Sequence, residues 1–358
     1  MSTEKFNIIV DNLYYLCKHS LVMVREFRNP AMDCYQRVKV VTKPGDKTPL
    51  ANCFIDYTDQ KTCYGTIFAI HGYGGAPTDP ALLHVKQCAL DRGFNFVAIE
   101  SYVMSYSSRW PIPESDVKLM TMDYYRKSIH AGVTVALRDK KLASGYRIAW
   151  AHCLGCRVIV DNYMASKRGN SIFDEFVFVA PYFVPETKLL QTRMRLMQRD
   201  PSGQMWNRIA NKIYFSHYTL NGFEFHFPKN GHLFDSILKD LPDVHCGNEA
   251  HECIDLERYV NDLFKKSYAS MADSFNSKLC SCILAESDHI IDCKNTERFY
   301  NMLPIKTKSI IRLNGAGHDL ENAQEKYAIA IKMILDRTCA YLKARDTILS
   351  DLTFSKAL

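Results

Sequence analysis

The sequence predicts an α/β protein with a mostly parallel central sheet, helices on both faces and an inserted cap. Short apolar segments with strand character recur along the chain, helical segments separate them, and the long interval 184–278 fits neither pattern. Strands that alternate with helices are typical of a parallel sheet covered on both faces. The 358 residues are 47% hydrophobic and 23% charged, enough for one large domain or two modest ones.

The N-terminal residues 1–34 precede this pattern. Residues 1–30 have a partly amphipathic, helical character, with Leu13, Leu16, Val22 and Val24 as predicted packing positions. We therefore expect a helical extension before the main domain.

The first part of the main domain is predicted at 35–183. Residues 35–41 and 53–57 alternate in polarity, as antiparallel edge strands do. Core strands are expected at 65–70, 94–99, 146–150 and 176–181, with a long helix over about 117–140. The second part of the domain is predicted at 279–358, with strands at 279–285 and 309–313 and a helix after them.

The turn after the 146–150 strand is the most informative stretch. Residues 151–156 read Ala-His-Cys-Leu-Gly-Cys, and residues 157–164 can run as a helix with one apolar face. A strand that turns sharply into a helix presents the residue at the turn, and small neighbours let the backbone fold back. Cys153 stands at this turn, Gly155 is a small neighbour, and Ala151 stands where glycine is commoner. We predict that Cys153 is a nucleophile and that His152 packs nearby.

Two downstream turns supply an acid and a histidine. Asp288 lies just past the 279–285 strand, although Glu286 and Asp292 are close enough to take its place after a small register change. A glycine-rich turn after the 309–313 strand contains His318. His318 is predicted to take the thiol proton, and Asp288 to orient the imidazole and stabilise its charged form.

An upstream turn supplies the candidate oxyanion site. The 65–70 strand leads into residues 71–75, His-Gly-Tyr-Gly-Gly. Gly72 and Gly74 let the backbone turn so that the N–H of Tyr73 can face a developing oxyanion. The second donor would be the N–H of Leu154, the residue after the nucleophile. His71 is predicted to support this turn.

With these motifs the chain resembles the α/β-hydrolase superfamily, and within it the monoacylglycerol lipases and related esterases. The resemblance runs from about residue 65 to about residue 342, with a gap in the middle. It implies a catalytic triad in the chain order Cys153, Asp288, His318. Cysteine replaces the usual serine, as in dienelactone hydrolases and polyhydroxyalkanoate synthases, whose remaining features are not found here.

The interval 184–278 is predicted to be a cap or lid over the active site. It is aromatic and basic, with Trp206, Tyr214, Phe215, Tyr218, Phe223, Phe225 and Phe227, and with Arg193, Arg195, Arg199, Arg208 and Lys212. An apolar lining with a few cations suits an acyl chain that carries an anionic group, such as an acyl-coenzyme A or an acyl carrier protein thioester. The alternative is that the aromatic residues form the core of the cap and the cations its solvated face.

The predicted function is hydrolysis of a small-molecule acyl ester or thioester through an acyl-cysteine intermediate. One alternative is transfer of the acyl group to an alcohol or amine. Others are a catalytically inactive binding protein, or a redox protein using the C-x-x-C pattern of Cys153 and Cys156. No cofactor or metal is predicted. The loop 245–253 packs two histidines and two cysteines together, but their spacing matches no common zinc module.

Charge and cysteine content limit the binding partners and the cellular compartment that we expect. A net charge of +6 is mild for this length, so nucleic-acid binding is not expected. We expect no membrane span and no secretory signal. The 13 cysteines form an odd, scattered set, which favours a reducing compartment, and we expect a cytoplasmic protein. The sequence assigns no oligomeric state.

Overall fold

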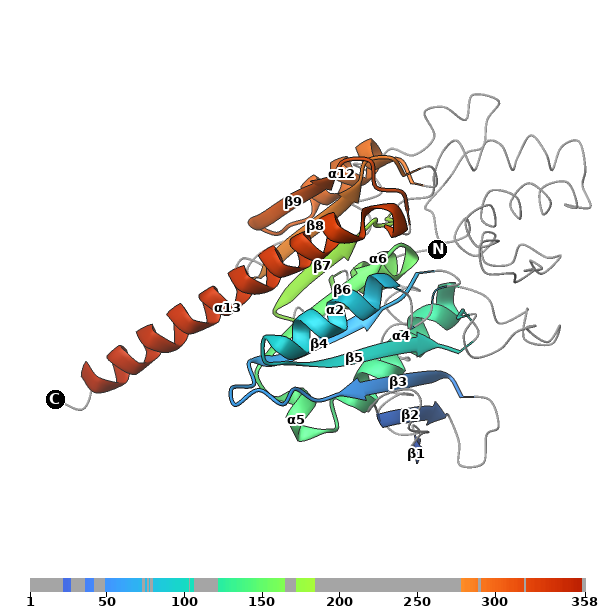
Figure 1. The fold of residues 1–358 in the computed structure, drawn as a ribbon. Coiled ribbons are helices and arrows are strands. Elements are labelled where there is room, and N and C mark those ends of the chain that lie inside the picture. The colour runs from blue at the N-terminus through green and yellow to red at the C-terminus, as the bar shows by residue number, and fades with distance from the viewer. Residues whose placement is uncertain are drawn as a thin grey trace, which may run out of the picture.

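The computed structural model describes residues 22–26, 36–41, 49–72, 75, 77, 80–102, 104–105, 122–164, 172–183, 278–288, 291–318 and 320–355. Within these residues nine strands form one sheet in the order β1-β2-β3-β5-β4-β6-β7-β8-β9 (Figure 1). The strands are β1 (Val22–Glu26), β2 (Gln36–Val41), β3 (Ala51–Asp56), β4 (Gly65–Ile70), β5 (Phe94–Ser101), β6 (Tyr146–His152), β7 (Glu175–Val179), β8 (Leu279–Ala285) and β9 (Thr307–Leu313).

The described α-helices are α2 (Pro80–Asp91), α4 (Met122–Ala136), α5 (Lys140–Ala143), α6 (Leu154–Ile159), α12 (Cys293–Met302) and α13 (Gln324–Ser355). A π-helix, η1 (Val160–Met164), continues α6, and a short 3₁₀ turn, η3 (Glu321–Ala323), precedes α13.

The sheet is antiparallel at one edge and parallel elsewhere. Strands β1, β2, β3 and β5 pair antiparallel in that order, and the pairs from β5 through β4 to β9 are all parallel. The chain moves from β4 to β5 on one side and then crosses back to β6 on the other. In sheets of this kind a crevice opens at the carboxyl ends of the strands where the order reverses. The ends of β4 and β6 therefore mark the expected place of a site.

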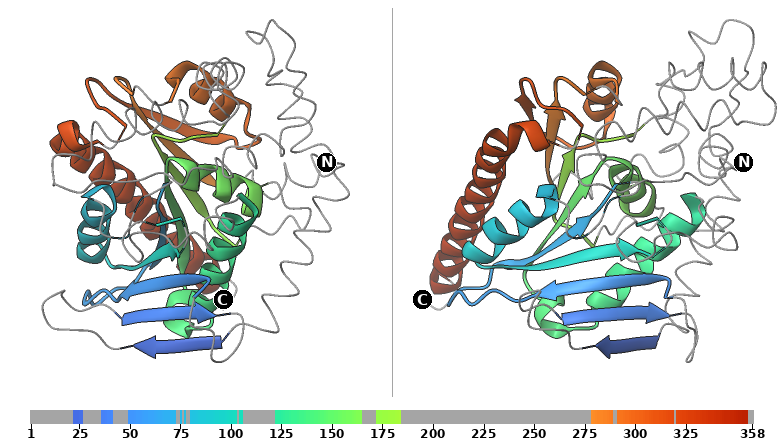
Figure 2. Two further views of the ribbon diagram at one scale, coloured as in Figure 1. Left: turned by 90° about the vertical axis from the view of Figure 1, so that its right-hand side faces the viewer. Right: turned by 45° about the vertical axis from the view of Figure 1, so that its right-hand side comes forward.

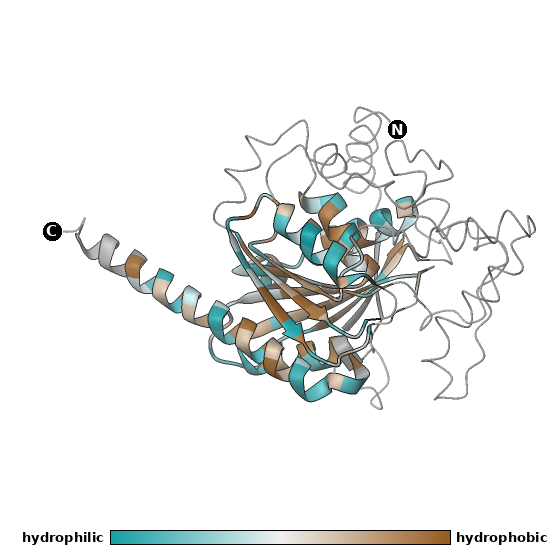
Figure 3. Ribbon diagram, turned by 90° about the horizontal axis from the view of Figure 1, so that it is seen from above, coloured by the Kyte–Doolittle hydropathy of each residue, from teal (hydrophilic) through white to brown (hydrophobic). Residues whose placement is uncertain are grey.

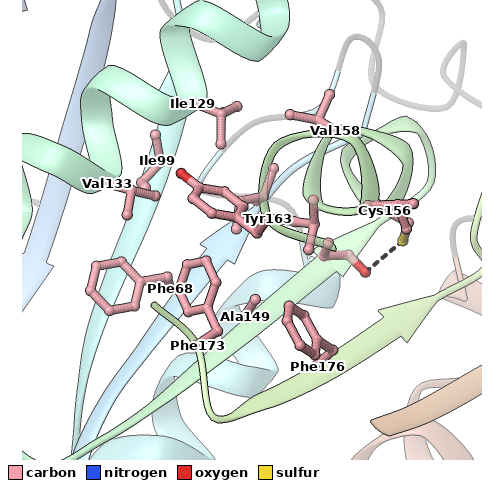
Figure 4. Close-up of a cluster of buried hydrophobic side chains, with 14 of the residues drawn as sticks. Phe68, Ile99, Ile129, Val133, Ala149, Cys156, Val158, Tyr163, Phe173 and Phe176 are labelled. Atoms are coloured by element: carbon pink, nitrogen blue, oxygen red, sulfur yellow. Dashed lines mark hydrogen bonds between the residues drawn. The ribbon is translucent and has the colours of Figure 1, made fainter. Parts of the chain in front are cut away.

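Two helix layers cover the sheet (Figure 2). Helices α4, α6 and α12 contribute to one buried apolar cluster, and α2 and α13 to the other. Successive residues of a strand point to opposite faces, so Ala149 joins the first cluster and Trp150 the second. Figure 4 shows part of the first cluster, where Ala149 lies among the rings of Phe68, Phe173 and Phe176. These parallel strands are apolar on both faces because both faces are buried.

The long helix α13 begins on the sheet and extends past it (Figures 1 and 3). Its attached half is fixed by Glu175, a fully buried carboxylate at the start of β7. The Arg337 guanidinium and the Thr338 hydroxyl, at 2.8 Å, donate hydrogen bonds to it. Farther along, Ile348 is exposed.

The topology confirms the predicted α/β-hydrolase fold. Within the helical extension predicted over residues 1–34, the structure differs at Val22–Glu26, which is an edge strand paired with β2. Val22 and Val24 are two residues apart, which is also the period of a strand. Pairing with the open edge of β2 supplies backbone hydrogen bonds. Leu13 and Leu16 lie outside the described residues.

The structure also bears on the predicted helix over about 117–140 and on the predicted cap. The helix predicted over about 117–140 is interrupted, because α4 ends at Ala136 and Asp139 caps the separate helix α5 by accepting a hydrogen bond from the Lys141 N–H. The predicted cap lies almost entirely outside the described residues, which resume at Lys278, and the 245–253 loop lies outside them too. In the part of the chain that the structure describes, no helix combines the length and apolar character needed to cross a membrane.

Candidate active site

Cys153 occupies a strained turn between β6 and α6. Its backbone angles are φ 51° and ψ −124°, in a region that residues with a side chain seldom adopt. Three backbone hydrogen bonds hold the turn: the Cys153 N–H donates to Val179 (3.0 Å), and its carbonyl accepts from Cys156 (3.1 Å) and Tyr182 (3.0 Å). Such strain persists only where the surrounding structure enforces it, and it is common at functional sites.

Two glycines let the neighbouring segments approach this turn. A β-carbon on Gly155 would stand 2.5 Å from the carbonyl oxygen of His71, so helix α6 could not pack against the end of β4 with a larger residue there. A β-carbon on Gly72 would stand 2.7 Å from the Cys153 Cβ and 3.4 Å from its Sγ. The turn after β4 therefore passes directly beside the cysteine.

His71 holds the turn after β4 through hydrogen bonds of its ring. The Ser101 N–H donates to His71 Nε2 at 3.0 Å, so the ring proton is on Nδ1, which donates to the Gly72 carbonyl at 2.6 Å. Burial lowers the pKa of His71, against smaller raising effects of the Gly72 hydrogen bond and Glu100. The Tyr125 hydroxyl also donates to the His71 carbonyl. A neutral imidazole with a hydrogen bond at each ring nitrogen thus fixes the start of the turn. Tyr73 and Gly74 lie outside the described residues.

Leu154 is the first residue of α6. A backbone N–H in the first turn of a helix has no acceptor within the helix. The positive end of the helix dipole lies at the same place. Leu154 is therefore positioned to offer a hydrogen bond beside the Cys153 side chain.

His318 and Asp288 form a buried pair. His318 Nδ1 donates to Asp288 Oδ2 at 2.7 Å, and the two side chains are 8% and 1% exposed. The other Asp288 oxygen accepts from the Ile291 N–H at 2.9 Å. These bonds fix the carboxylate and leave His318 Nε2 as the ring atom available to a second partner.

The structure separates Asp288 from the two neighbouring acids. Glu286 is exposed. Asp292 is the N-cap of α12, and its side chain accepts from the N–H groups of Lys294 (2.8 Å) and Asn295 (3.3 Å). Of these three acids, Asp288 is the one whose carboxylate contacts His318.

Cys153 is the second group that acts on His318, and its sulfur is the strongest influence raising the pKa of the ring. Burial of the ring alone lowers the pKa of His318. The Cys153 sulfur and the Asp288 carboxylate outweigh burial, so the pKa of His318 lies well above its ordinary value. The surroundings of His318 therefore favour the protonated form of its ring.

The loop that bears His318 is held by side-chain hydrogen bonds that the sequence analysis did not predict. Asn322 Oδ1 accepts from the Gly317 N–H at 2.9 Å, and its Nδ2 donates to the Gly315 carbonyl at 2.8 Å. The Ser287 N–H also donates to the Ala316 carbonyl at 2.9 Å, which joins the acid loop to the histidine loop. An asparagine a few residues after Gly-Ala-Gly-His was the available signal, since Asn commonly bonds nearby backbone.

The sequence analysis also did not predict a buried ionic cluster close to the turn at Cys153. Asp161 accepts from Arg126 Nε at 2.9 Å and from Arg157 Nε at 2.8 Å, and it is fully buried. Arg157 Nη1 donates to the Phe183 carbonyl at 2.7 Å, in the segment that follows β7. The Asn162 side chain donates to the Arg126 carbonyl at 3.0 Å. The π-helical turn of η1 thus places two successive polar residues against α4.

Cys156 is more deeply buried than Cys153. It is fully buried, and its thiol donates to the Ala151 carbonyl at 3.1 Å (Figure 4). Burial raises the pKa of the Cys156 thiol well above its ordinary value. The Cys156 thiol is therefore enclosed and held by the backbone.

Comparisons with known proteins were made at the level of family, sequence and structure. No family model matches the chain, and no curated protein sequence matches it significantly. Solved structures similar to it include Est1E from Butyrivibrio proteoclasticus, with 13% identity over 90% of this chain and 99% of that chain and a TM-score of 0.47. Acetyl xylan esterase 1 from Thermoanaerobacterium sp. has 10% identity over 93% and 94%, with a TM-score of 0.49.

Alpha/beta hydrolase domain-containing protein 10 from mouse has 12% identity over 88% of this chain and 99% of that chain, with a TM-score of 0.47. These likenesses are too distant to transfer an activity. The chemistry of the site must follow from its own residues.

Proposed function

We propose that this protein is an acyl ester or thioester hydrolase that works through a covalent acyl-cysteine on Cys153. The observation that supports this best is the buried His318–Asp288 pair, hydrogen-bonded at 2.7 Å, together with the Cys153 sulfur that raises the pKa of the same histidine. A thiolate, rather than a thiol, is the nucleophile in such chemistry. The imidazolium of His318 supplies the charge that stabilises it.

The acylation step uses each of these groups. The Cys153 thiolate attacks the substrate carbonyl carbon, and the carbonyl oxygen becomes an oxyanion. The N–H of Leu154 and, in this proposal, that of Tyr73 bind the oxyanion, and one such donor lowers the barrier by about 3 kcal/mol. His318 then gives its Nε2 proton to the leaving alcohol or thiol as the carbon–heteroatom bond breaks. Asp288 keeps Nδ1–H in place throughout.

The second step releases the acyl group. Neutral His318 accepts a proton from water, the resulting hydroxide attacks the acyl-cysteine, and the oxyanion forms again in the same site. Collapse expels the Cys153 thiolate, which recovers its imidazolium partner, and the carboxylic acid leaves. An alcohol or amine in place of water would give acyl transfer by the same steps.

Intact-protein mass spectrometry tests the proposal. Wild type and Cys153→Ala would be incubated briefly with p-nitrophenyl esters and with acyl-coenzyme A thioesters of several chain lengths. We expect a mass increase of one acyl group on wild type alone. The member that reacts fastest identifies the acyl group, and decay of the adduct with and without added alcohols or amines separates hydrolysis from transfer. Equal adducts on both proteins, or none on either while both remain folded, would refute the proposal.

A further inference from the structure

His152 ends strand β6 on a defined face of the sheet. Side chains along a strand alternate, and Trp150 packs on the α2 and α13 side, where its indole N–H donates to the Tyr327 hydroxyl in α13 at 3.3 Å. His152 is two residues farther along, so it points to the same face. The loop that bears His318 also lies on this side, because it leads from β9 into α13.

His152 contacts the main chain of the predicted catalytic histidine. Its Nε2 lies 3.2 Å from the His318 carbonyl oxygen, and the centroids of the two rings are 5.3 Å apart. A carbonyl oxygen only accepts hydrogen bonds, so Nε2 of His152 must be the donor. The residue is 8% exposed, which makes this bond a shielded one.

The opposite edge of the same ring faces the turn after β4. His152 Nδ1 lies 3.4 Å from the position that a β-carbon on Gly72 would occupy. The ring is therefore packed between that turn and the His318 loop, and its own backbone leads directly into Cys153. Three segments that are far apart in sequence meet at this side chain.

We propose that His152 is a positioning residue that sets the His318 imidazole relative to the Cys153 sulfur. This rests on the proposed catalytic pair. The bonds from Asn322 and Ser287 fasten the histidine loop to itself and to the acid loop, whereas the His152 bond joins it to the strand that carries the nucleophile. A displacement of about 1 Å between reacting groups can lower a rate by about 100-fold. The titratable groups around His152 include Cys153, His318 and, behind His318, Asp288.

Two substitutions separate the hydrogen bond from the bulk of the ring. His152→Phe keeps a planar ring and removes the donor, and His152→Gln keeps a side-chain N–H at a similar reach. The readout is the rate of Cys153 alkylation by iodoacetamide between about pH 5 and pH 9, followed by peptide mass spectrometry, because only the thiolate reacts. We expect His152→Phe to react about tenfold more slowly at about pH 6, because a displaced His318 ring would support the Cys153 thiolate less; a tenfold change corresponds to about 1.4 kcal/mol. It should approach wild type at alkaline pH, and His152→Gln should stay within about twofold of wild type.

Trp150→Phe is the matched control. It removes a buried N–H donor from the same face of β6 without touching the site. We expect it to lower the thermal midpoint and leave the alkylation profile unchanged. A His152→Phe profile that superimposes on that of wild type, with both proteins folded, would overturn the proposal. So would equal shifts in His152→Phe and Trp150→Phe.

The acyl-adduct experiment distinguishes this result from failure of the proposed function. A shifted alkylation profile without any acyl adduct on wild type would support the role of His152 and refute acyl transfer. An acyl adduct on wild type with an unshifted His152→Phe profile would do the reverse.

Discussion

Gly72 and Cys153 lie so close together that a β-carbon on the glycine would be 2.7 Å from that of the cysteine. The contact joins the turn after β4 to the turn after β6, two strands that are neighbours in the sheet. Because carbon atoms of side chains do not approach this closely, any larger residue must move one turn away from the other. The separation of these two turns is therefore set by the absence of a side chain at position 72.

The first prediction concerns this contact. Gly72→Ala should lower the rate of Cys153 acylation by about 100-fold or more, the effect of losing one oxyanion donor. Gly317→Ala is the control, because a β-carbon there would meet nothing closer than the Asn322 side chain at 3.7 Å, although it is adjacent to His318. Stopped-flow measurement of p-nitrophenolate release would compare both. Similar rates for the two variants would contradict the prediction.

The second prediction concerns the acid. Asp288→Asn should lower kcat by about 10⁴-fold, because the His318 tautomer and the charge of its ring are no longer controlled. Asp292→Asn should leave kcat nearly unchanged, since that residue caps α12, and should reduce stability by no more than about 1 kcal/mol. Glu286→Gln, at an exposed position, should alter neither quantity. A larger loss of kcat in Asp292→Asn or Glu286→Gln than in Asp288→Asn would contradict the assignment.

The sequence predicted the fold where local pattern and burial agree. Strands β4, β5, β6 and β8 read as continuous apolar runs because both of their faces are covered, and periodicity finds such runs easily. It failed at Val22–Glu26, where a short apolar segment has no local feature that separates strand from helix. What decided the matter was pairing with β2, a contact with a segment farther along the chain.

The site follows the same division. Chain order and turn chemistry predicted Cys153, Asp288 and His318 just after β6, β8 and β9, and the structure hydrogen-bonds His318 to Asp288. The Asp161 cluster could not be foreseen, because an arginine on α4 reaches it from 35 residues earlier in the sequence. The burial of Cys156 could not be predicted either, because a C-x-x-C pattern gives the spacing of two cysteines and not which thiol is buried.

The third prediction concerns pH. The pKa of His318 is raised above 6.5 in the folded protein, with Cys153 the largest raising influence. A group whose pKa is raised on folding stabilises the protein fully below its unfolded pKa, and this contribution is lost as pH rises through the folded value. We therefore expect the loss of unfolding free energy in His318→Gln to be larger at about pH 6 than at about pH 9.

Titration by NMR of the His318 ring tests the cause. Its pKa should fall in Cys153→Ser, which removes the sulfur, and should fall again in Cys153→Ser combined with Asp288→Asn. If the stability difference between wild type and His318→Gln grew with pH instead, the assigned direction of the shift would be wrong.

The fourth prediction concerns Cys156. Cys156→Ala should acylate at Cys153 as wild type does and lose about 1 kcal/mol or somewhat more in stability, because a buried thiol that donates to Ala151 is removed. In native wild type, iodoacetamide should modify Cys153 long before Cys156, since burial raises the pKa of the Cys156 thiol. Loss of acylation in Cys156→Ala comparable with that in Cys153→Ala would favour the redox interpretation.

The last prediction concerns the buried charged side chains around Asp161. Asp161→Asn should destabilise the protein by about 3–5 kcal/mol, because the guanidinium groups of Arg126 and Arg157 would remain enclosed after losing a shared carboxylate. Asp336→Asn removes the carboxylate partner of Arg92 on the surface, where Asp336 is 64% exposed, and should cost less than about 1 kcal/mol. Urea unfolding at neutral pH compares the two, and equal losses would mean that the internal cluster contributes no more than a surface pair. Because Arg157 also holds the Phe183 carbonyl, Asp161→Asn should raise the rate of proteolysis in the segment 180–183 more than Asp336→Asn does.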